Sequence, residues 1–353
     1  MWIEPFSLPL ESPLNTAKGP ITERRGFLVG VGDDDGGAVT NEEPAGIGEA
    51  TPLPGWTESY EACQDALAAA DPATGETHPD PATTPAAAHA IELAELDARG
   101  RRTATPLAGL LRREIDVDDS VPSTVPVNAT IGDNTVEHTV GAAETAVSAG
   151  FDCLKCKVGS RGVEEDIERI RAVREAVGDG IEIRVDANGA WTEATAETAI
   201  TAFAELDVSY VEQPLAAESL AAHSRLRDRG VDIALDESLS TVSVETIIEQ
   251  SAADTVILKP MALGGPRRAI RSAATAREAG LRPVVTTTID AVVARTAAVH
   301  VAAAIPDVGA CGLATGALLR EELAADPVTI AGGTARVPTG GGLCGDCVRT
   351  LRS

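Results

Sequence analysis

The sequence contains no long apolar run. Its apolar segments are short and are interrupted by charged residues or glycine, and none approaches the roughly 20 apolar residues that a membrane-spanning helix needs. The first ten residues include Glu4 and lack the basic start of a secretory signal peptide. We therefore expect a cytoplasmic protein without a membrane partner.

Basic residues are scarce as well. The chain has 29 lysines and arginines against 54 aspartates and glutamates, which gives a formal net charge of −25. This balance excludes the basic surface with which proteins bind nucleic acids. Dispersed acidity keeps a protein soluble but makes its compact state repel itself, and halophilic proteins use it. We interpret the charge as a halophilic adaptation to a salt-rich cytoplasm, with ordinary acidic solubility as the alternative.

Lysine is the rarest charged residue. Only Lys18, Lys155, Lys157 and Lys259 occur, and the other 25 basic residues are arginines. A buried lysine can lose its proton, whereas arginine stays protonated. The four lysines are therefore candidates for chemistry that arginine cannot perform.

The six cysteines include two pairs with the spacing of a metal or redox motif, Cys153/Cys156 and Cys344/Cys347. The first pair falls on an expected strand, where residues three apart point to opposite faces. The second pair lies in a glycine-rich tail and is a candidate redox or metal clip. We favour reduced, structural cysteines, as is usual in a cytosol.

The chain divides into three parts by composition. Residues 1–120 combine strand-like runs, a Pro/Ala/Thr-rich loop and an Ala/Leu/Glu helix at 86–99, which predicts a small α+β capping domain. Residues 121–325 alternate short apolar runs with helical patterns. Residues 326–353 form a C-terminal segment that we expect to return to the cap.

The alternating part predicts a closed parallel barrel of the (β/α)₈ type. Expected strands are 125–131, 153–158, 181–187, 210–212, 233–236, 255–259, 283–287 and 311–313. Expected helices are 135–149, 164–176, 194–206, 219–229, 242–252, 266–279 and 291–304. Helix ends are marked by Gly150, Gly178, Gly230 and Gly280. An open doubly wound sheet is the alternative, but no GxGxxG follows its first strand.

Charged residues end five successive expected strands, and catalytic groups of barrels lie at such ends. They are Lys157, Asp186, Glu212, Asp236 and Lys259, separated by 29, 26, 24 and 23 residues. Each step is about one strand and one helix, so all five side chains can line one mouth. Within their strands, Lys155 shares a face with Lys157, and Arg184 shares one with Asp186.

Three acids that converge in an apolar barrel repel each other unless a cation neutralises them. Mg²⁺, with Mn²⁺ as an alternative, accepts a few carboxylates and leaves room for a substrate. Such an ion lowers the cost of an enediolate made from a substrate carboxylate, and a lysine can take the α-proton. The alternatives are solvated strand ends or ion pairs, a non-catalytic ligand-binding barrel, and a Schiff-base aldolase that uses Lys259.

At these residues the chain resembles the muconate-lactonizing subgroup of the enolase superfamily. The resemblance rests on Lys155-Cys156-Lys157, Val185-Asp186-Ala187-Asn188, Val211-Glu212-Gln213-Pro214, Asp236-Glu237-Ser238 and Leu258-Lys259-Pro260. It implies a cap over the barrel mouth and Asp186, Glu212 and Asp236 as Mg²⁺ ligands. It also implies Lys157 and Lys259 as an acid/base pair on opposite faces of the substrate, with Lys155 in support.

The segment 46–55, which reads GIGEATPLPG, resembles the cap of the o-succinylbenzoate synthase group, and Arg184 also fits that group. These enzymes dehydrate a cyclohexadiene carboxylate on the menaquinone pathway. By analogy, Lys157 removes the proton and then protonates the departing hydroxyl, while Lys259 is a cation near the ring. N-succinylamino-acid racemization and muconate cycloisomerization use the same lysine pair and stay open.

Two other members of the family fit less well. Dipeptide epimerases carry an Asp-x-Asp on strand eight, where this chain reads CGLATG at 311–316. A mandelate-racemase-like histidine on strand seven is missing, because Thr286, Thr287 and Thr288 stand there.

The resemblance and the strand ends together suggest contacts for a small carboxylate substrate. Lys18 lies in the loop between the first two cap strands, which closes over the substrate in this superfamily. The other predicted substrate contacts are Arg184, Asn188, Thr287 and Gly312. Oligomeric state stays open, with a homo-oligomer as one alternative.

Overall fold

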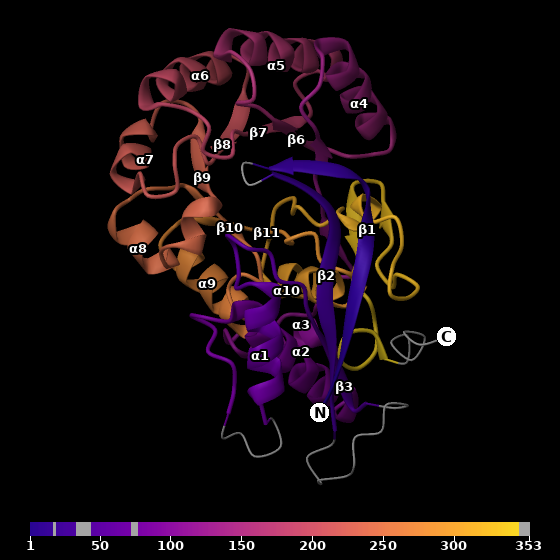
Figure 1. The fold of residues 1–353 in the computed structure, drawn as a ribbon. Helices are drawn as coiled ribbons and strands as arrows, with labels where there is room; N and C mark the ends of the chain where they lie inside the picture. The colour runs from indigo at the N-terminus through magenta and orange to yellow at the C-terminus, as the bar shows by residue number, and fades with distance from the viewer. Residues whose placement is uncertain (17–18, 33–43, 72–76, 346–353) are drawn as a thin grey trace.

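The computed structural model describes residues 1–16, 19–32, 44–71 and 77–345. Its N-terminal part is an antiparallel sheet with helices on one side (Figure 1). Strands β1 (Trp2–Thr16), β2 (Gly19–Val31) and β3 (Gly46–Ala50) follow each other in that sheet. Helices α1 (Tyr60–Ala69), α2 (Pro85–Arg102) and α3 (Leu107–Arg113) complete the cap.

Strand β3 lies directly on helix α2. A Cβ atom at Gly48 would come within 1.8 Å of the Ala90 carbonyl oxygen, and one at Gly46 within 2.0 Å of that of Ala94. Only glycine permits this approach. Because neighbouring strand residues point to opposite faces, Glu49, which directly follows Gly48, points away from α2.

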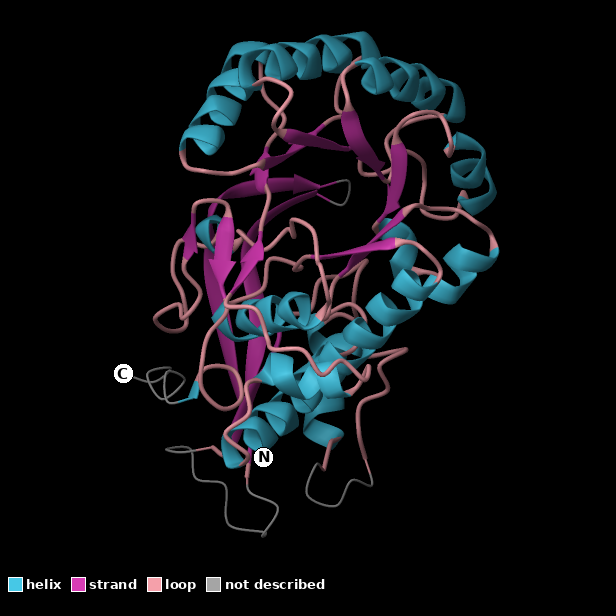
Figure 2. Cartoon of the chain, turned by 180° about the vertical axis from the view of Figure 1, so that it is seen from behind, coloured by secondary structure: helices cyan, strands magenta, loops and turns pink. Residues whose placement is uncertain are grey.

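The central part is the predicted barrel. Seven parallel strands pair in chain order: β5 (Ala129–Ile131), β6 (Cys153–Lys157), β7 (Glu182–Asp186), β8 (Val208–Glu212), β9 (Asp232–Leu235), β10 (Thr255–Leu258) and β11 (Arg282–Val285). Residues Cys311 and Gly312 close the ring, because Cys311 bridges to Val127 and Gly312 bridges to Thr286. The strands form an inner ring with the helices outside it (Figure 2). The fold prediction, including the α+β cap, is confirmed.

The barrel helices are α4 (Val136–Ser148), α5 (Val163–Val177), α6 (Glu193–Glu205), α7 (Leu220–Leu226), α8 (Val244–Glu249), α9 (Pro266–Glu278) and α10 (Val292–Ala304). Short 3₁₀ turns η1 (Glu237–Ser240) and η2 (Gly316–Leu318) follow β9 and the closing residues. All four glycines expected at helix ends have positive φ. Helix α10 is buried over its whole length, since it lies between the barrel and the cap.

Several elements differ from their predicted extent, and three of these differences have a local explanation. Helix α7 ends at Leu226, because Arg227 turns extended and its guanidinium binds Asp254. Helix α8 begins at its Ser243 cap and ends before Ser251, whose φ is 49°. The expected strand 125–131 is split into β4 (Thr124–Pro126) and β5, because the chain changes sheets there.

The C-terminal segment pairs with the start of the barrel and then contacts the cap. Strands β12 (Ile330–Ala331) and β13 (Thr334–Arg336) form a small sheet with β4. Further on, the Leu107 amide donates to the Gly342 carbonyl at 2.8 Å, and the Leu343 amide donates to Asp97 at 2.8 Å. The domain boundaries at residues 120 and 325 stay predictions.

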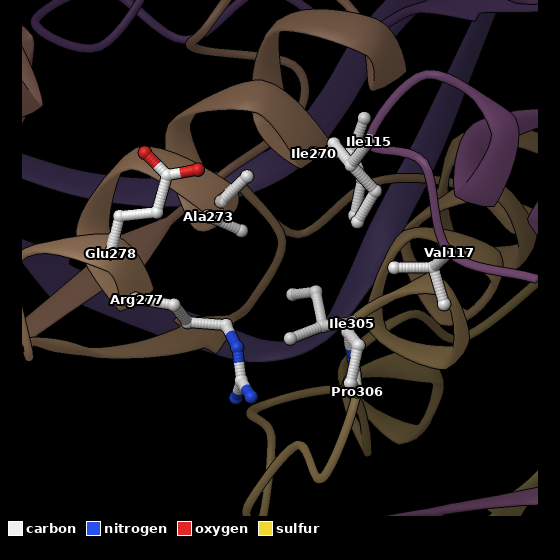
Figure 3. A pocket seen from close by; sticks show the side chains of 9 residues that line it. Ile115, Val117, Ile270, Ala273, Arg277, Glu278, Ile305 and Pro306 are labelled. Carbon is white, nitrogen blue, oxygen red and sulfur yellow. The ribbon is translucent and has the colours of Figure 1, made fainter.

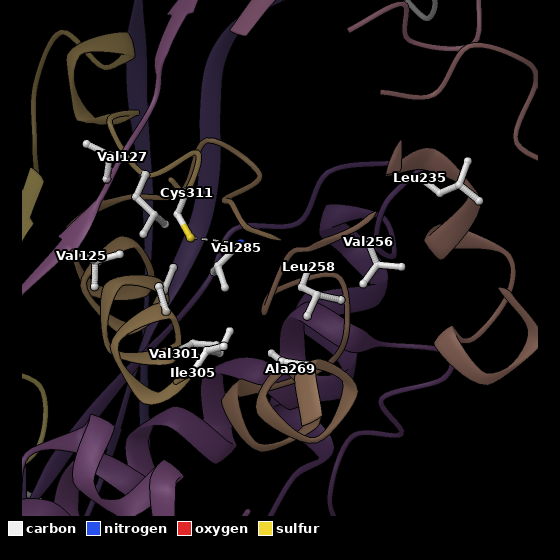
Figure 4. Close-up of a cluster of buried hydrophobic side chains, with 14 of the residues drawn as sticks. Val125, Val127, Leu235, Val256, Leu258, Ala269, Val285, Val301, Ile305 and Cys311 are labelled. Atoms are coloured by element: carbon white, nitrogen blue, oxygen red, sulfur yellow. Dashed lines mark hydrogen bonds between the residues drawn. The ribbon is translucent and has the colours of Figure 1, made fainter. Parts of the chain in front are cut away.

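Apolar side chains from the outer face of the strands pack against the helices. Val256, Leu258 and Val285 face Ala269 and Val301 of α9 and α10 (Figure 4). The inner face of the barrel carries the charged strand-end residues together with a small buried cluster of Tyr210, Ala234, Ile257 and Val284. Core packing therefore fixes the strands whose ends carry the predicted site.

No helix of the described residues is long and apolar enough to span a bilayer. Cys63, Cys153, Cys156 and Cys311 are buried free thiols, as expected of structural cysteines. Cys344 is disulfide-bonded, which differs from the expectation of reduced cysteines. Glycines with positive φ at 340, 342 and 345 fold the chain tightly there. Cys347 lies outside the described residues.

The charge of −25 predicts a strong salt dependence. Raising KCl from about 0.1 M to 1 M shortens the Debye length from about 10 Å to about 3 Å, so acidic self-repulsion falls. We expect the melting temperature to rise steeply over this range and beyond, measured by circular dichroism. Sucrose at equal osmolality is the control for general solute exclusion. A flat melting temperature up to saturation would refute the halophilic interpretation.

Candidate functional site

The five predicted strand-end residues meet at one end of the barrel. Lys157 stands opposite Asp186 in the register of β6 and β7, and Asp186 stands opposite Glu212 in that of β7 and β8. Asp236 directly follows β9, and Lys259 directly follows β10. Parallel strands bring their carboxyl ends to the same edge, so neighbouring strands place these groups at one level.

Asp186, Glu212 and Asp236 form a row of acids at this end of the barrel, called the acid row below. Each of the three is paired with a lysine. Lys155 Nζ lies 2.9 Å from Asp186 Oδ2 and 2.9 Å from Glu212 Oε1. Lys157 Nζ lies 2.7 Å from Asp186 Oδ2, and Lys259 Nζ lies 2.7 Å from Asp236 Oδ2. The row therefore has Lys157 near one end and Lys259 at the other, with Lys155 between Asp186 and Glu212.

The acids are buried, with exposed fractions of 1% for Asp186, 1% for Glu212 and 4% for Asp236. Burial opposes ionisation of Asp186, but Lys155 and Lys157 outweigh it and lower the pKa of that carboxyl. Burial, with the charges of Asp186 and Asp236, raises the pKa of Glu212 to about 8. For Lys155, the neighbouring acids outweigh burial and raise the pKa. The pKa of Glu212 is thus raised although three lysines match the three acids in number.

Within the described residues, no group of three or more carboxylate, imidazole or thiol side chains surrounds a common metal position. The three acids face lysines instead. Two observations still fit a divalent cation. The pKa of Glu212 is raised by burial and by the other two carboxylates, and Asp236 Oδ1 is buried without a hydrogen-bond partner. A hard cation with oxygen ligands would satisfy both.

Asn188 connects Lys157, at one end of the acid row, to a fourth acid, Glu237. Its Oδ1 accepts from Lys157 Nζ at 2.8 Å, and its Nδ2 donates to Glu237 Oε1 at 2.8 Å. Burial and the charges of Asp236 and Asp186 raise the pKa of Glu237 to about 7. Sequence reasoning quoted Glu237 only as part of a motif, although its position after Asp236 was a usable signal.

Trp56 of the cap is a second residue that sequence reasoning missed. Lys259 Nζ lies 3.2 Å from the centroid of the Trp56 ring, in cation–π geometry. The only signal was that Trp56 directly follows the segment 46–55. This contact brings the cap to the barrel mouth.

The other residues that were predicted to contact the substrate do not make the contacts of the acid row. The Arg184 guanidinium turns away from the acid row, pairs with Glu182 at 2.8 Å and donates to the Ala310 carbonyl at 2.7 Å. Thr287 Oγ1 lies 3.0 Å from the hydroxyl of Thr315. Gly312 packs so closely that a Cβ would lie 2.6 Å from Thr286 Oγ1. Lys18 lies outside the described residues. Their substrate roles stay predictions.

Comparison with known proteins assigns the family. The model of a family described as "Enolase C-terminal domain-like" matches residues 138–346, more than half of the chain. The chain belongs to this family. The predicted resemblance to the enolase superfamily is thereby confirmed, and residues 138–346 contain all three acids and the lysines that pair with them.

Relatives within the enolase family catalyse several reactions. The chain is 40% identical over 212 residues to an o-succinylbenzoate synthase of Thermobifida fusca, covering 59% of this chain and 65% of that protein. It is 33% identical over 221 residues to an N-succinyl-L-Arg/Lys racemase of Bacillus cereus, covering 62% and 58%. These matches span less than two thirds of the relatives' own lengths.

A solved structure shares the fold of nearly the whole chain. The dipeptide epimerase from Enterococcus faecalis, complexed with Mg and the dipeptide L-Leu-L-Tyr, superimposes with a TM-score of 0.80 and 25% sequence identity. The alignment covers 97% of each chain. The likeness therefore extends over the cap as well as the enolase-type barrel.

A cavity of about 150 Å³ lies elsewhere in the enolase-type barrel (Figure 3). Ile115, Glu278 and Pro306 line it, together with other residues of α9 and the α10 end. Glu278 ends α9, and Pro306 follows α10. Barrel helices begin near the mouth and end at the opposite face, so this cavity is remote from the acid row.

Proposed function

We propose that this protein removes the proton next to a substrate carboxylate through an enediolate, and that it is an o-succinylbenzoate synthase. The observation that carries the proposal is the row of three buried carboxylates with Lys157 near one end and Lys259 at the other. Such a row supplies oxygen ligands for a cation and a basic group on each side of a substrate held between them.

Asp186, Glu212 and Asp236 would hold the metal ion, Mg²⁺ by preference and Mn²⁺ as the alternative. When bound, the ion supplies positive charge that stabilises the negative charge developing on the substrate carboxylate. The lysines that now contact these acids would be released toward the substrate. Each Nζ lies within 3 Å of an acid oxygen, so a cation bound to these oxygens would compete with the lysines for them.

Lys157 would serve both proton transfers of the dehydration. Its neutral amine takes the α-proton from 2-succinyl-6-hydroxy-2,4-cyclohexadiene-1-carboxylate, and the resulting ammonium returns that proton to the departing hydroxyl, which leaves as water. Asn188, at 2.8 Å from Lys157 Nζ, orients the amine. Lys259 would supply a fixed positive charge on the other face, and its contact with Trp56 supports that role.

The identity to the Thermobifida fusca o-succinylbenzoate synthase supports the synthase. The proposal includes a place for this reaction in menaquinone biosynthesis. The B. cereus relative supports N-succinylamino-acid racemization as the second candidate, because a racemase needs one base on each face. Muconate cycloisomerization uses the same pair of lysines. A non-catalytic barrel leaves the pairing of all three acids with lysines unexplained.

A substrate panel in molar KCl with Mg²⁺ tests the proposal. It compares the cyclohexadiene carboxylate with N-succinylamino acids, dipeptides and muconolactone, each followed to initial rates. We expect the highest kcat/KM for the cyclohexadiene carboxylate, with o-succinylbenzoate as the product. A higher kcat/KM for an N-succinylamino acid would reassign the protein as a racemase, and no turnover of any compound would favour the binding barrel.

A further inference from the structure

The cap loop between residues 49 and 58 is held at both ends by carboxylates that bind the N-termini of helices. Glu49 accepts hydrogen bonds from the amides of Ala291 at 2.8 Å and Ala294 at 2.9 Å, at the start of α10. Glu58 accepts from the amides of Ala86 at 3.0 Å and Ala87 at 2.9 Å, at the start of α2. A carboxylate at such a position satisfies free amides and complements the helix dipole.

The Glu49 contact joins the cap to the barrel. Helix α10 has no capping side chain of its own, since its N-cap residue is Ala291. The cap is supplied instead by two distant carboxylates: Glu49, more than 240 positions earlier in the chain, and Glu322, which accepts from the Val292 amide at 3.1 Å. Glu49 is completely buried and also accepts from the Thr51 hydroxyl. A carboxylate buried this deeply loses its bonding partners if the cap moves away, which is costly.

A second buried charge holds the same loop. The Arg24 guanidinium donates to the carbonyls of Thr51 at 2.7 Å and Pro52 at 3.3 Å in the cap, and to that of Ile289 at 3.2 Å in the barrel. Ile289 belongs to the turn that leads from β11 to α10. Arg24 thus joins the cap loop to the barrel turn that contains Ile289.

Between the two anchors, the chain makes a tight turn that presents Trp56. The amides of Trp56 and Thr57 both donate to the Leu53 carbonyl at 2.9 Å, and the Leu53 amide donates to the Thr57 hydroxyl at 2.7 Å. This turn places the Trp56 ring on the Lys259 ammonium. The position of Trp56 therefore depends on an anchor that lies in the barrel.

We propose that Glu49 and Trp56 are positioning residues for Lys259. Glu49 holds the loop against the start of α10, and Trp56 keeps the Lys259 ammonium beside the acid row. The proposal rests on the proposed function only in taking Lys259 as a reactive group. It assigns Glu49 a role in the reaction, although Glu49 touches neither the acids nor the lysines in the described contacts.

The scarcity of lysine allows a direct test that needs no substrate. Protein labelled with ¹³C at lysine has four labelled residues, and Lys259→Arg assigns the Lys259 side-chain signal by its loss. In the presence of Mg²⁺ and molar KCl, the Trp56 ring should shift that signal upfield. Trp56→Leu should remove the shift, and Glu49→Gln should reduce it. An unchanged Lys259 signal in Trp56→Leu would overturn the proposal.

Asp97→Asn is the matched control for Glu49→Gln. Asp97 is also a buried cap carboxylate that accepts two backbone amides, from Ile47 at 3.1 Å and Leu343 at 2.8 Å. Its contacts are with β3 before Glu49, with Arg101 at 2.9 Å and with the C-terminal segment, and none of them is with residues 50–58. We expect Asp97→Asn to lower the melting temperature while the Lys259 signal and kcat/KM stay unchanged.

Kinetics of the same variants test whether Glu49 acts through Trp56. Loss of a cation–π contact predicts about a 2- to 30-fold fall in kcat/KM for Trp56→Leu. Glu49→Gln should have a smaller effect, and the double variant should be no worse than Trp56→Leu alone. If the losses of kcat/KM in the two single variants multiply in the double variant, Glu49 does not act through Trp56.

A further variant separates positioning from helix stability. If Glu49→Gln folds poorly, Ala291→Ser added to it gives α10 a cap of its own. We expect this pair to recover the melting temperature but neither the Lys259 shift nor kcat/KM. Recovery of all three would show that Glu49 matters only as a helix cap. An upfield Lys259 signal in a protein that makes no o-succinylbenzoate would contradict the proposed function. It would still support Glu49 and Trp56 as positioning residues for Lys259.

Discussion

Replacing Lys157 with alanine is expected to lower kcat by about 10²–10⁴-fold, the usual contribution of a general acid–base group, or more because it serves two proton transfers. Lys157 Nζ lies at the end of the acid row and is held by Asp186 and Asn188. Ligand binding should persist, since the three acids and Lys259 are untouched. The measurements are steady-state rates on the preferred substrate and calorimetric titration with the product.

Arg171→Ala is the control for loss of a positive charge. Arg171 is a surface residue of α5, a helix on the outside of the barrel, and pairs with the exposed Glu168 of the same helix. Such exposed pairs contribute little to stability. This variant should keep the rate of the parent protein. An unchanged rate in Lys157→Ala would remove the central claim of the proposed function, whatever the substrate is.

Arginine variants of the two lysines distinguish the synthase from the racemase. Lys157→Arg should not rescue activity in either case, because arginine keeps its proton and cannot act as a base. In a dehydration, Lys259 needs only to be a cation, so Lys259→Arg should retain part of the rate. In a racemization both lysines transfer protons, so the two arginine variants should be equally damaging. The ratio of their kcat values therefore decides between the two reactions.

Much of the site could be predicted because barrel geometry is periodic. One strand and one helix take a nearly constant length of chain, so charged residues spaced like Lys157, Asp186 and Glu212 fall at neighbouring strand ends. Side-chain alternation then puts Lys155 beside Lys157 on the inner face. Both rules act over short distances in sequence, and a single chain is enough to apply them.

Contacts between distant parts of the chain could not be predicted in this way. No local pattern shows that Glu49 caps α10 or that Trp56 lies on Lys259, because both depend on how the cap docks. Arg184 shows the same limit in the barrel. The prediction that Arg184 shares a strand face with Asp186 was correct. However, the Glu182 carboxylate two residues earlier turns the Arg184 guanidinium away from the acid row. The eighth strand was expected at 311–313, and the structure has isolated bridges at Cys311 and Gly312 in its place.

Removing divalent metal is expected to lower activity by about 10³-fold or more, because a bound cation supplies several kcal/mol of charge stabilisation in the transition state. EDTA followed by exhaustive dialysis should abolish turnover, and Mg²⁺ should restore it. The structural reason is the acid row itself. Its three carboxylates are buried together, and burial with the charges of Asp186 and Asp236 raises the pKa of Glu212 to about 8. Full activity in metal-free protein would contradict the metal site.

Asp236→Asn tests the same site from the protein's side. The substitution keeps the shape of the side chain but removes a charge whose Oδ1 has no hydrogen-bond partner. We therefore expect weaker Mg²⁺ binding by calorimetry, with the barrel still folded. Asp254→Asn is the matched control, because Asp254 precedes β10 at the opposite end of the barrel and binds Arg227. Loss of that ion pair should reduce stability and leave the Mg²⁺ titration unchanged. Equal Mg²⁺ affinity in the two variants would mean that the ion binds elsewhere than at the acid row.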